Sequence, residues 1–154
     1  MKATSVSHRQ LSDAPELQEV LTRYIDSRDG YQQAAELVDH RALAEELRTI
    51  SRRRSVIIET IKDAIAEQGQ KVDQEGSTEA KDRRWNLEFQ SGVSRDDVSP
   101  IISECIRSER ELDRALAHAC KDSETLPSHL PMLEAARSDV LSSICGLEAI
   151  VEAF

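Results

Sequence analysis

The sequence is poor in the residues that build β-sheets and disulfide-linked folds. Only five of its 154 residues are aromatic, five are glycine and four are proline, whereas Ala, Leu, Ile, Glu and Arg are abundant, as in helical proteins. The three cysteines, Cys105, Cys120 and Cys145, are odd in number, widely spaced and without a CxxC motif. They match neither a disulfide framework nor a zinc site, so we expect buried, reduced thiols in an all-α domain.

Long apolar runs and a basic surface are also missing. No stretch of about 18 apolar residues occurs and the N-terminus has no apolar signal region, so we expect no membrane insertion, no export and a cytoplasmic location. The net charge of -9 repels phosphate backbones, and the one dense basic run, Arg52–Arg54, spreads over several helix faces. Nucleic-acid binding is therefore not expected.

The chain length of 154 residues and an apolar content of 39% suit one domain. Residues 1–11 are polar and unpatterned and predict a flexible tail, followed by a single domain over 12–154. Asp13 and Asp39 are expected to cap the first two helices, and Gly69 to end the second. A proline in the first turn introduces the third helix, and Ser128 is expected to cap the fourth.

Apolar residues in each helix recur at alternating spacings of three and four, which is typical of a helix that packs along one seam. The predicted seams are Leu17, Leu21, Tyr24, Arg28, Tyr31, Ala35 and Val38 in the first helix; Leu43, Leu47, Ile50, Arg54, Ile57, Ile61 and Ala64 in the second; Val98, Ile102, Cys105, Glu109, Leu112, Leu116 and Ala119 in the third; and Leu130, Leu133, Arg137, Val140, Ile144, Leu147 and Val151 in the fourth. Four such helices predict an antiparallel four-helix bundle.

A short extra helix is expected between the second and third long helices, at about residues 78–90. It has Trp85 and Phe89 on one side. Aromatic residues four apart on a helix usually pack against a neighbour, so we expect this helix to cover the core or to form a dimer contact.

Each seam is interrupted once, near the middle of its helix, by a charged residue: Arg28, Arg54, Glu109 and Arg137. Midpoints of helices meet at one depth of a bundle whichever way the helices run. Buried charges need partners, and Asp113 and Glu134 flank the seams at this depth. We therefore predict a buried ion network made of Arg28, Arg54, Glu109, Asp113, Glu134 and Arg137.

Three interpretations of this network remain open. It can be purely structural and fix helix order, or its guanidinium groups can bind a small anion. It can also be a metal centre, because bundle cores hold di-iron or di-manganese sites built from Glu and Glu-x-x-His. The chain has no Glu-x-x-His motif; the remaining candidate metal ligands are Glu36, His40, Glu109, Asp113 and Glu134.

Catalytic motifs are absent as well. No nucleotide-binding glycine loop occurs, and no Ser-His-Asp or Cys-His arrangement is indicated. We expect no catalytic residue and no cofactor, although the metal-site interpretation would require iron or manganese.

Several segments together resemble a bacterial ferritin-like family of uncharacterised four-helix-bundle proteins. They are Asp26-Ser27-Arg28-Asp29-Gly30-Tyr31, Ala34-Ala35-Glu36, Asp39, Leu43, Leu47, Ile50, Arg54, Gly69, Gly76-Ser77, Trp85, Glu109 and Leu126-Pro127. The resemblance covers roughly residues 15–150. It implies a ferritin- or rubrerythrin-like bundle, often dimeric and associated with bacterial stress, without an assigned reaction.

The resemblance also implies that Arg54 and Glu109 match the family's own arginine and acid, whereas Arg28 stands where the family often has an acid. A permanent positive charge at Arg28 would replace a cation electrostatically. We therefore expect a cytoplasmic, non-enzymatic, homodimeric ferritin-like bundle with a structural ion network. The alternatives are a di-iron or di-manganese oxidoreductase and, second, a small-anion-binding module.

Overall fold

Four long helices form the protein in a computed structural model that describes residues 12–83 and 98–153. They are α2 (Ala14–Leu37), α3 (Arg41–Glu67), α5 (Ser99–Lys121) and α6 (Leu130–Ala153), with a 3-10 turn, η1 (Pro127–His129), before α6. The described residues contain no strand, and none of their helices is both long and apolar enough to cross a membrane. The all-α bundle predicted from the sequence is confirmed.

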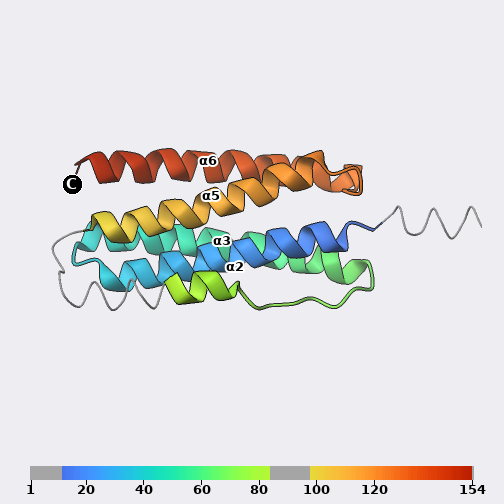
Figure 1. Ribbon diagram of the computed structural model, residues 1–154, viewed down its shortest axis with the longest axis horizontal. Coiled ribbons are helices and arrows are strands. Elements are labelled where there is room, and N and C mark those ends of the chain that lie inside the picture. The colour runs from blue at the N-terminus through green and yellow to red at the C-terminus, as the bar shows by residue number, and fades with distance from the viewer. Residues whose placement is uncertain (1–11, 84–97, 154) are drawn as a thin grey trace, which may run out of the picture.

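The helices follow an up-down-down-up order (Figure 1). α2 is antiparallel to α3, and the connection after α3 returns along the bundle, so that α5 starts at the same end as α3. α2 packs against both α3 and α5, and α5 packs against α6. This connectivity, in which one long crossover joins two helical hairpins, is that of ferritin-like folds.

The predicted short helix lies partly outside the described residues. Residues 78–83 are helical. Trp85 and Phe89, which we expected to cover the core or a dimer contact, fall in the part that the structure does not describe, as does the predicted tail 1–11.

Buried apolar residues follow the predicted seams closely. They form two clusters, one toward each end of the bundle. The first includes Leu17, Leu21, Tyr24, Ile61, Leu112, Leu116, Leu133 and Val140, and the second includes Tyr31, Ala35, Leu43, Leu47, Ile102 and Leu147. Ile58 is buried where Ile57 was expected, and Ile57 is half-buried.

Helix ends are only partly as predicted. Gly69 follows α3 with a φ of +75°, a conformation that glycine adopts without strain, so its predicted role is confirmed. The predicted cap at Asp39 is wrong, because His40 is the N-cap of α3 and its Nδ1 accepts a hydrogen bond from the Leu43 amide at 3.2 Å. Ser128 lies within η1 and α6 starts at Leu130.

Asp13 precedes α2 as predicted, but its side chain makes no cap to that helix. The fully buried carboxylate instead accepts hydrogen bonds from Gln68 Nε2 at 2.8 Å and from the Leu126 amide at 3.0 Å. His129 Nδ1 lies 2.6 Å from the same carboxylate. Asp13 thus joins the start of α2, the end of α3 and the loop before α6.

Asp26 anchors the crossover in a similar way. Its buried carboxylate accepts hydrogen bonds from the amide and the hydroxyl of Ser77, each at 2.8 Å. Ser77 Oγ accepts a hydrogen bond from the Ala80 amide, at the start of the short helix. A Cβ at Gly76 would lie 2.6 Å from Asp26 Oδ1, so only glycine lets the chain pass this close.

We predict that Gly76→Ala lowers the free energy of unfolding by about 1–3 kcal/mol, because the clash displaces a buried carboxylate from its donors. Gly146→Ala is the matched control. A Cβ there meets no atom within 4 Å, and replacing a mid-helix glycine should stabilise by roughly 0.5–1 kcal/mol. Urea unfolding of both variants measures the difference; equal effects would contradict the close approach.

Candidate functional site

A charged layer separates the two apolar clusters at the middle of the bundle. Arg54 of α3 and Glu109 of α5 are both fully buried, and Arg54 Nη2 donates to Glu109 Oε2 at 2.5 Å. Arg54 Nη1 donates to Asp139 of α6 at 2.7 Å, and Nη2 also donates to Ser143 Oγ at 3.1 Å. One guanidinium therefore connects three helices.

The remaining helix, α2, completes the layer. Ser27 Oγ donates to Glu109 Oε1 at 2.6 Å. The rings of Tyr24 and Tyr31 lie 6.0 and 5.9 Å from the Arg54 guanidinium carbon, at the outer limit of cation–π contact. Ser27, Arg54, Glu109, Asp139 and Ser143 are called the charged layer below.

Side chains of the charged layer bridge the gap between α3 and α6. The backbones of α3 and α6 do not approach each other closely, unlike the other neighbouring pairs of long helices. Arg54 reaches across to Asp139, and Arg53 donates to the same carboxylate at 3.3 Å. The group of Arg53, Arg54, Glu109 and Asp139 carries two positive and two negative charges and is therefore neutral.

Burial and pairing act against each other on these groups. Burial raises the pKa of the Glu109 carboxyl, while Arg54 and the hydrogen bond from Ser27 oppose that rise. Burial lowers the pKa of Arg54, but Glu109, Tyr31 and Asp139 together raise it above its usual value. Arg54 is therefore always charged, and Glu109 is its buried counter-ion.

Three polar atoms beside the pair have no hydrogen-bond partner within the described residues: Arg54 Nε and the hydroxyls of Tyr24 and Tyr31. The Tyr31 hydroxyl is near enough to favour ionised Glu109, but its geometry falls short of a hydrogen bond. Burial raises the pKa of both tyrosines, so they stay neutral.

The structure brings together some of the six residues expected in the network and not others. Arg54 and Glu109 meet in the core. Arg137 and Asp113 pair with each other at 2.9 Å, partly exposed, between α5 and α6. Glu134 is exposed.

Arg28 lies outside the core, where its Nε donates to Asp29 Oδ1 at 2.9 Å. Ser27 is buried in its place. The seam of α2 advances by three and then four residues between Tyr24 and Tyr31, whereas the sequence analysis assumed four and then three. The polar side chain of Ser27 thereby faces Glu109.

Asp139 and Ser143 were missed because they flank the apolar seam of α6. They lie four residues apart and on one side of the helix, which is a weak signal. Arg54 itself is the stronger one, since a buried arginine requires acids on more than one neighbour.

The residues proposed as metal ligands do not come together. Glu36 and His40 are exposed at the α2–α3 junction, and the described residues contain no group of three or more His, Cys, Asp or Glu that could hold an ion. Both oxygens of Glu109 are already hydrogen-bonded. A fixed guanidinium beside it would repel a divalent cation, so these residues do not fit a di-metal centre.

The small-anion interpretation also finds little support in this geometry. Both terminal nitrogens of Arg54 donate to protein oxygens. A bidentate anion would have to displace Asp139 or Glu109, and the displaced acid would then repel it.

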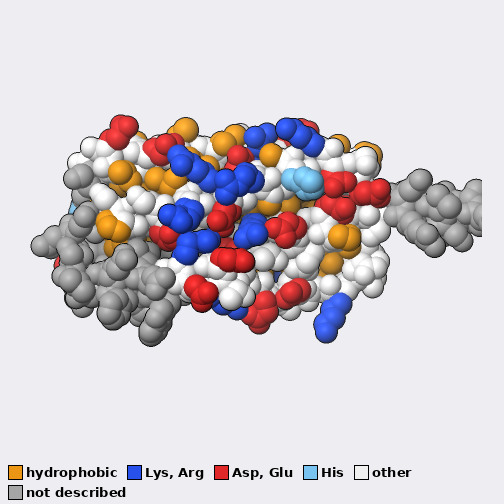
Figure 2. All heavy atoms as spheres, in the orientation of Figure 1, with side chains coloured by type: hydrophobic (Ala, Val, Ile, Leu, Met, Phe, Trp, Pro, Cys, Tyr) orange, Lys and Arg blue, Asp and Glu red, His pale blue; other side chains and the backbone are white. Residues whose placement is uncertain are grey.

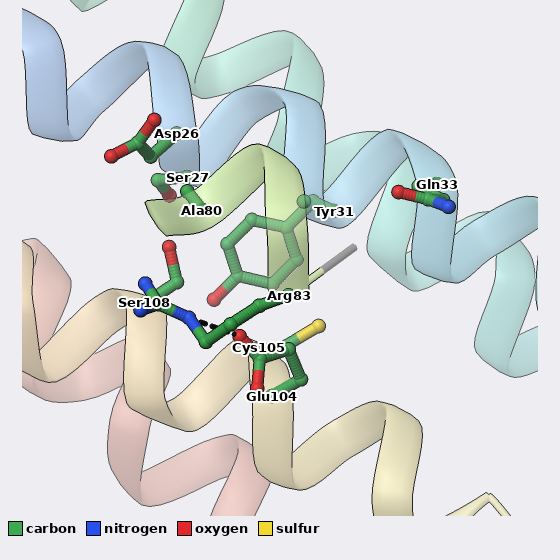
Figure 3. A pocket seen from close by; sticks show the side chains of 10 residues that line it. Asp26, Ser27, Tyr31, Gln33, Ala80, Arg83, Glu104, Cys105 and Ser108 are labelled. Carbon is green, nitrogen blue, oxygen red and sulfur yellow. Dashed lines mark hydrogen bonds and ion pairs between the residues drawn. The ribbon is translucent and has the colours of Figure 1, made fainter. Parts of the chain in front are cut away.

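A small cavity lies beside the layer, between α2, the short helix and α5 (Figure 3). Tyr31, Cys105 and Ser108 line it, and an ion pair of 2.7 Å between Arg83 and Glu104 lies at its edge. Its volume is about 20 Å³. One water needs roughly 10–15 Å³, so the cavity suits a water molecule rather than a substrate.

The protein is thus an all-helical bundle with a buried ion pair at its centre. Its chain belongs to the family described as Domain of unknown function (DUF2383), whose model matches residues 14–122. The match includes α2, α3 and α5, and with them Ser27, Arg54 and Glu109, but not α6. No curated protein and no solved structure matches the chain. That the chain belongs to a family of unknown function is thus shown, while the expected relation to ferritins or rubrerythrins stays a prediction.

The three cysteines differ in exposure, contrary to the expectation that all are buried. Cys105 is buried, Cys120 is half-buried and Cys145 is exposed on α6. Burial raises the pKa of the Cys105 thiol far above its usual value. All three are free thiols.

We predict that a disulfide reagent added to folded protein reacts fastest with Cys145 and does not react with Cys105 until the protein unfolds, because only the exposed thiolate is a competent nucleophile. Absorbance of the released reagent measures the phases. Cys145→Ser should remove the fast phase and Cys105→Ser should leave it. A fast phase that survives Cys145→Ser contradicts this assignment.

Proposed function

We propose that the protein is a non-enzymatic helical-bundle protein with a structural or interaction role, in which the charged layer stands where a ferritin-like bundle would hold a di-metal site. The observation behind this proposal is the fully buried Arg54–Glu109 pair. It provides a permanent cation at the centre of the bundle.

The first supporting step is electrostatic. In a di-metal bundle, several core carboxylates share two divalent ions. Here Arg54 neutralises Glu109, and Arg53 with Arg54 neutralises Asp139. No carboxylate charge remains for a metal within the layer.

The second step concerns specificity. A buried ion pair adds little net stability, because its desolvation cost is close to its Coulomb gain, but breaking it is expensive. Arg54 meets Glu109 across the diagonal between α3 and α5, and it meets Asp139 on α6, the neighbour of α3 in this arrangement. We infer that the layer selects this helix arrangement over others with equally good apolar seams.

The third step concerns chemistry. Burial raises the pKa of Glu109, Tyr24, Tyr31 and Cys105, and the adjoining cavity admits no more than a water. Within the described residues no activated nucleophile faces an open pocket. The buried groups of the charged layer are thus unsuited to proton transfer or nucleophilic attack.

We predict that Glu109→Ala lowers the free energy of unfolding by about 3–5 kcal/mol, because it leaves Arg54 buried without its counter-ion. The paired variant Arg54→Met/Glu109→Leu should recover most of this loss, because it removes both charges together. Chemical unfolding measures both. Asp113→Ala, which breaks a partly exposed pair, is the control and should cost at most about 1 kcal/mol.

Elemental analysis of protein purified without chelators tests the same proposal against the metal alternative. We expect far less than one iron or manganese per chain, and no rise in melting temperature when either ion is added. Stoichiometric metal that disappears in a folded Glu109→Ala protein would overturn the proposal.

A further inference from the structure

A groove between α5 and α6 has walls of opposite charge. One wall carries Arg107, Arg110 and Arg114 of α5 beside Glu111, whose carboxylate pairs with Arg23 and Arg83. Glu148 and Glu152 of α6 form the other wall. Ile106 and Val151, both half-buried, also line the groove. Figure 2 shows Lys and Arg side chains gathered on this face of the molecule, close to acidic ones.

These charges are poorly satisfied within one chain. Arg110 pairs with Glu148 at 3.3 Å, but both side chains are about half exposed, at 56% and 49%. Arg107 is 64% exposed and lies 3.6 Å from Glu104, a long contact. Arg114 and Glu152 are exposed and form no ion pair within the described part of the chain.

The arginine wall is unusual for a chain with 29 acids and 20 bases. Its members recur at spacings of three and four, so they lie along one line of α5. The line continues through Ser103, His118 and Lys121, and Glu111, which also lines the groove, is offset from it. The outward side of α6 is different again, with exposed positions that carry no charge: Ala135, Ser138, Ser142, Gly146 and Ala149.

We propose that this groove is the interface of a homodimer in which α5 of each copy packs against α6 of the other. A two-fold axis parallel to the helices brings each arginine wall against the glutamate wall of the second copy. Because α5 and α6 are antiparallel, the paired helices across the interface are antiparallel too. The arrangement uses one patch twice, as a two-fold dimer requires.

Charge complementarity selects a second copy over other partners. An acidic peptide or a nucleic acid would match the arginine wall but meet repulsion from Glu148 and Glu152. A basic partner would match the glutamate wall but meet repulsion from the arginine wall. Only a surface with both signs in the opposite order satisfies both walls, and this chain has such a surface.

The interface does not depend on the role of the charged layer in the core. The half-buried Ile106 and Val151 supply apolar contact at its centre.

The test reverses one wall at a time. Arg107→Glu/Arg114→Glu makes both walls acidic, and Glu148→Arg/Glu152→Arg makes both walls basic. We expect wild-type protein to sediment as a dimer, and each variant alone to be a monomer or to have a Kd at least about tenfold weaker, because like charges then face each other.

Mixing the two variants is the decisive measurement. Their walls are complementary, so an equimolar mixture should sediment as a heterodimer, and all four changes in one chain should restore the homodimer. Neither result is expected if the changes merely unfold the protein. Circular dichroism and the unfolding midpoint of each variant verify the fold.

Arg48→Glu/Arg52→Glu on the exposed side of α3 is the matched control, because it changes the net charge by the same amount on another face. It should remain dimeric. A monomeric wild type, a mixture that stays monomeric, or a control that dissociates as fully as the groove variants would each overturn the proposal.

Discussion

The contact between Arg54 and Glu109 constrains the rest of the structure more than any other. Each ion loses several kcal/mol of hydration when it is buried, so the fold must deliver partners to both from every side. α3 supplies Arg54, α5 supplies Glu109, α2 supplies Ser27 and α6 supplies Asp139 and Ser143. The apolar clusters on either side provide the hydrophobic stabilisation, whereas the layer determines which helix lies beside which.

Two other buried acids hold the connections between helices in place through hydrogen bonds, as Glu109 does for the helices themselves. Asp13 accepts hydrogen bonds from the α3 end and from the loop before α6, and Asp26 accepts them from Ser77 in the crossover. Each joins segments more than fifty residues apart in sequence. Since a buried carboxylate without donors is costly, these loops are held in place by the same physical requirement that orders the bundle.

Helices and their apolar seams were predictable because burial on one face dictates the spacing. Arg54 and Glu109 were recognisable for the same reason, as charges that interrupt an apolar stripe. The sequence analysis placed Arg28 in the α2 seam because alternating spacings of three and four residues allow either Ser27 or Arg28 there. Packing in the folded bundle decides between them. His40 replaced Asp39 as a cap because either side chain can accept from the first turn. Asp139 was missed because it lies outside the apolar seam of α6 and is about half exposed. Such a position does not interrupt any apolar spacing.

The family match covers part of the charged layer, because α6 lies outside the matched residues. The neutral, fully buried Arg54–Glu109 pair and Ser27, which donates to Glu109, lie within the matched residues 14–122. Asp139 on α6 brings an extra negative charge, and the exposed Arg53 balances it. α6 is thus joined to the layer through Asp139, which pairs with both Arg54 and Arg53, through Ser143, and through its packing on α5. The same helix presents both the glutamate wall and an uncharged outward side, so the helix that closes the charged layer also carries half of the proposed dimer interface.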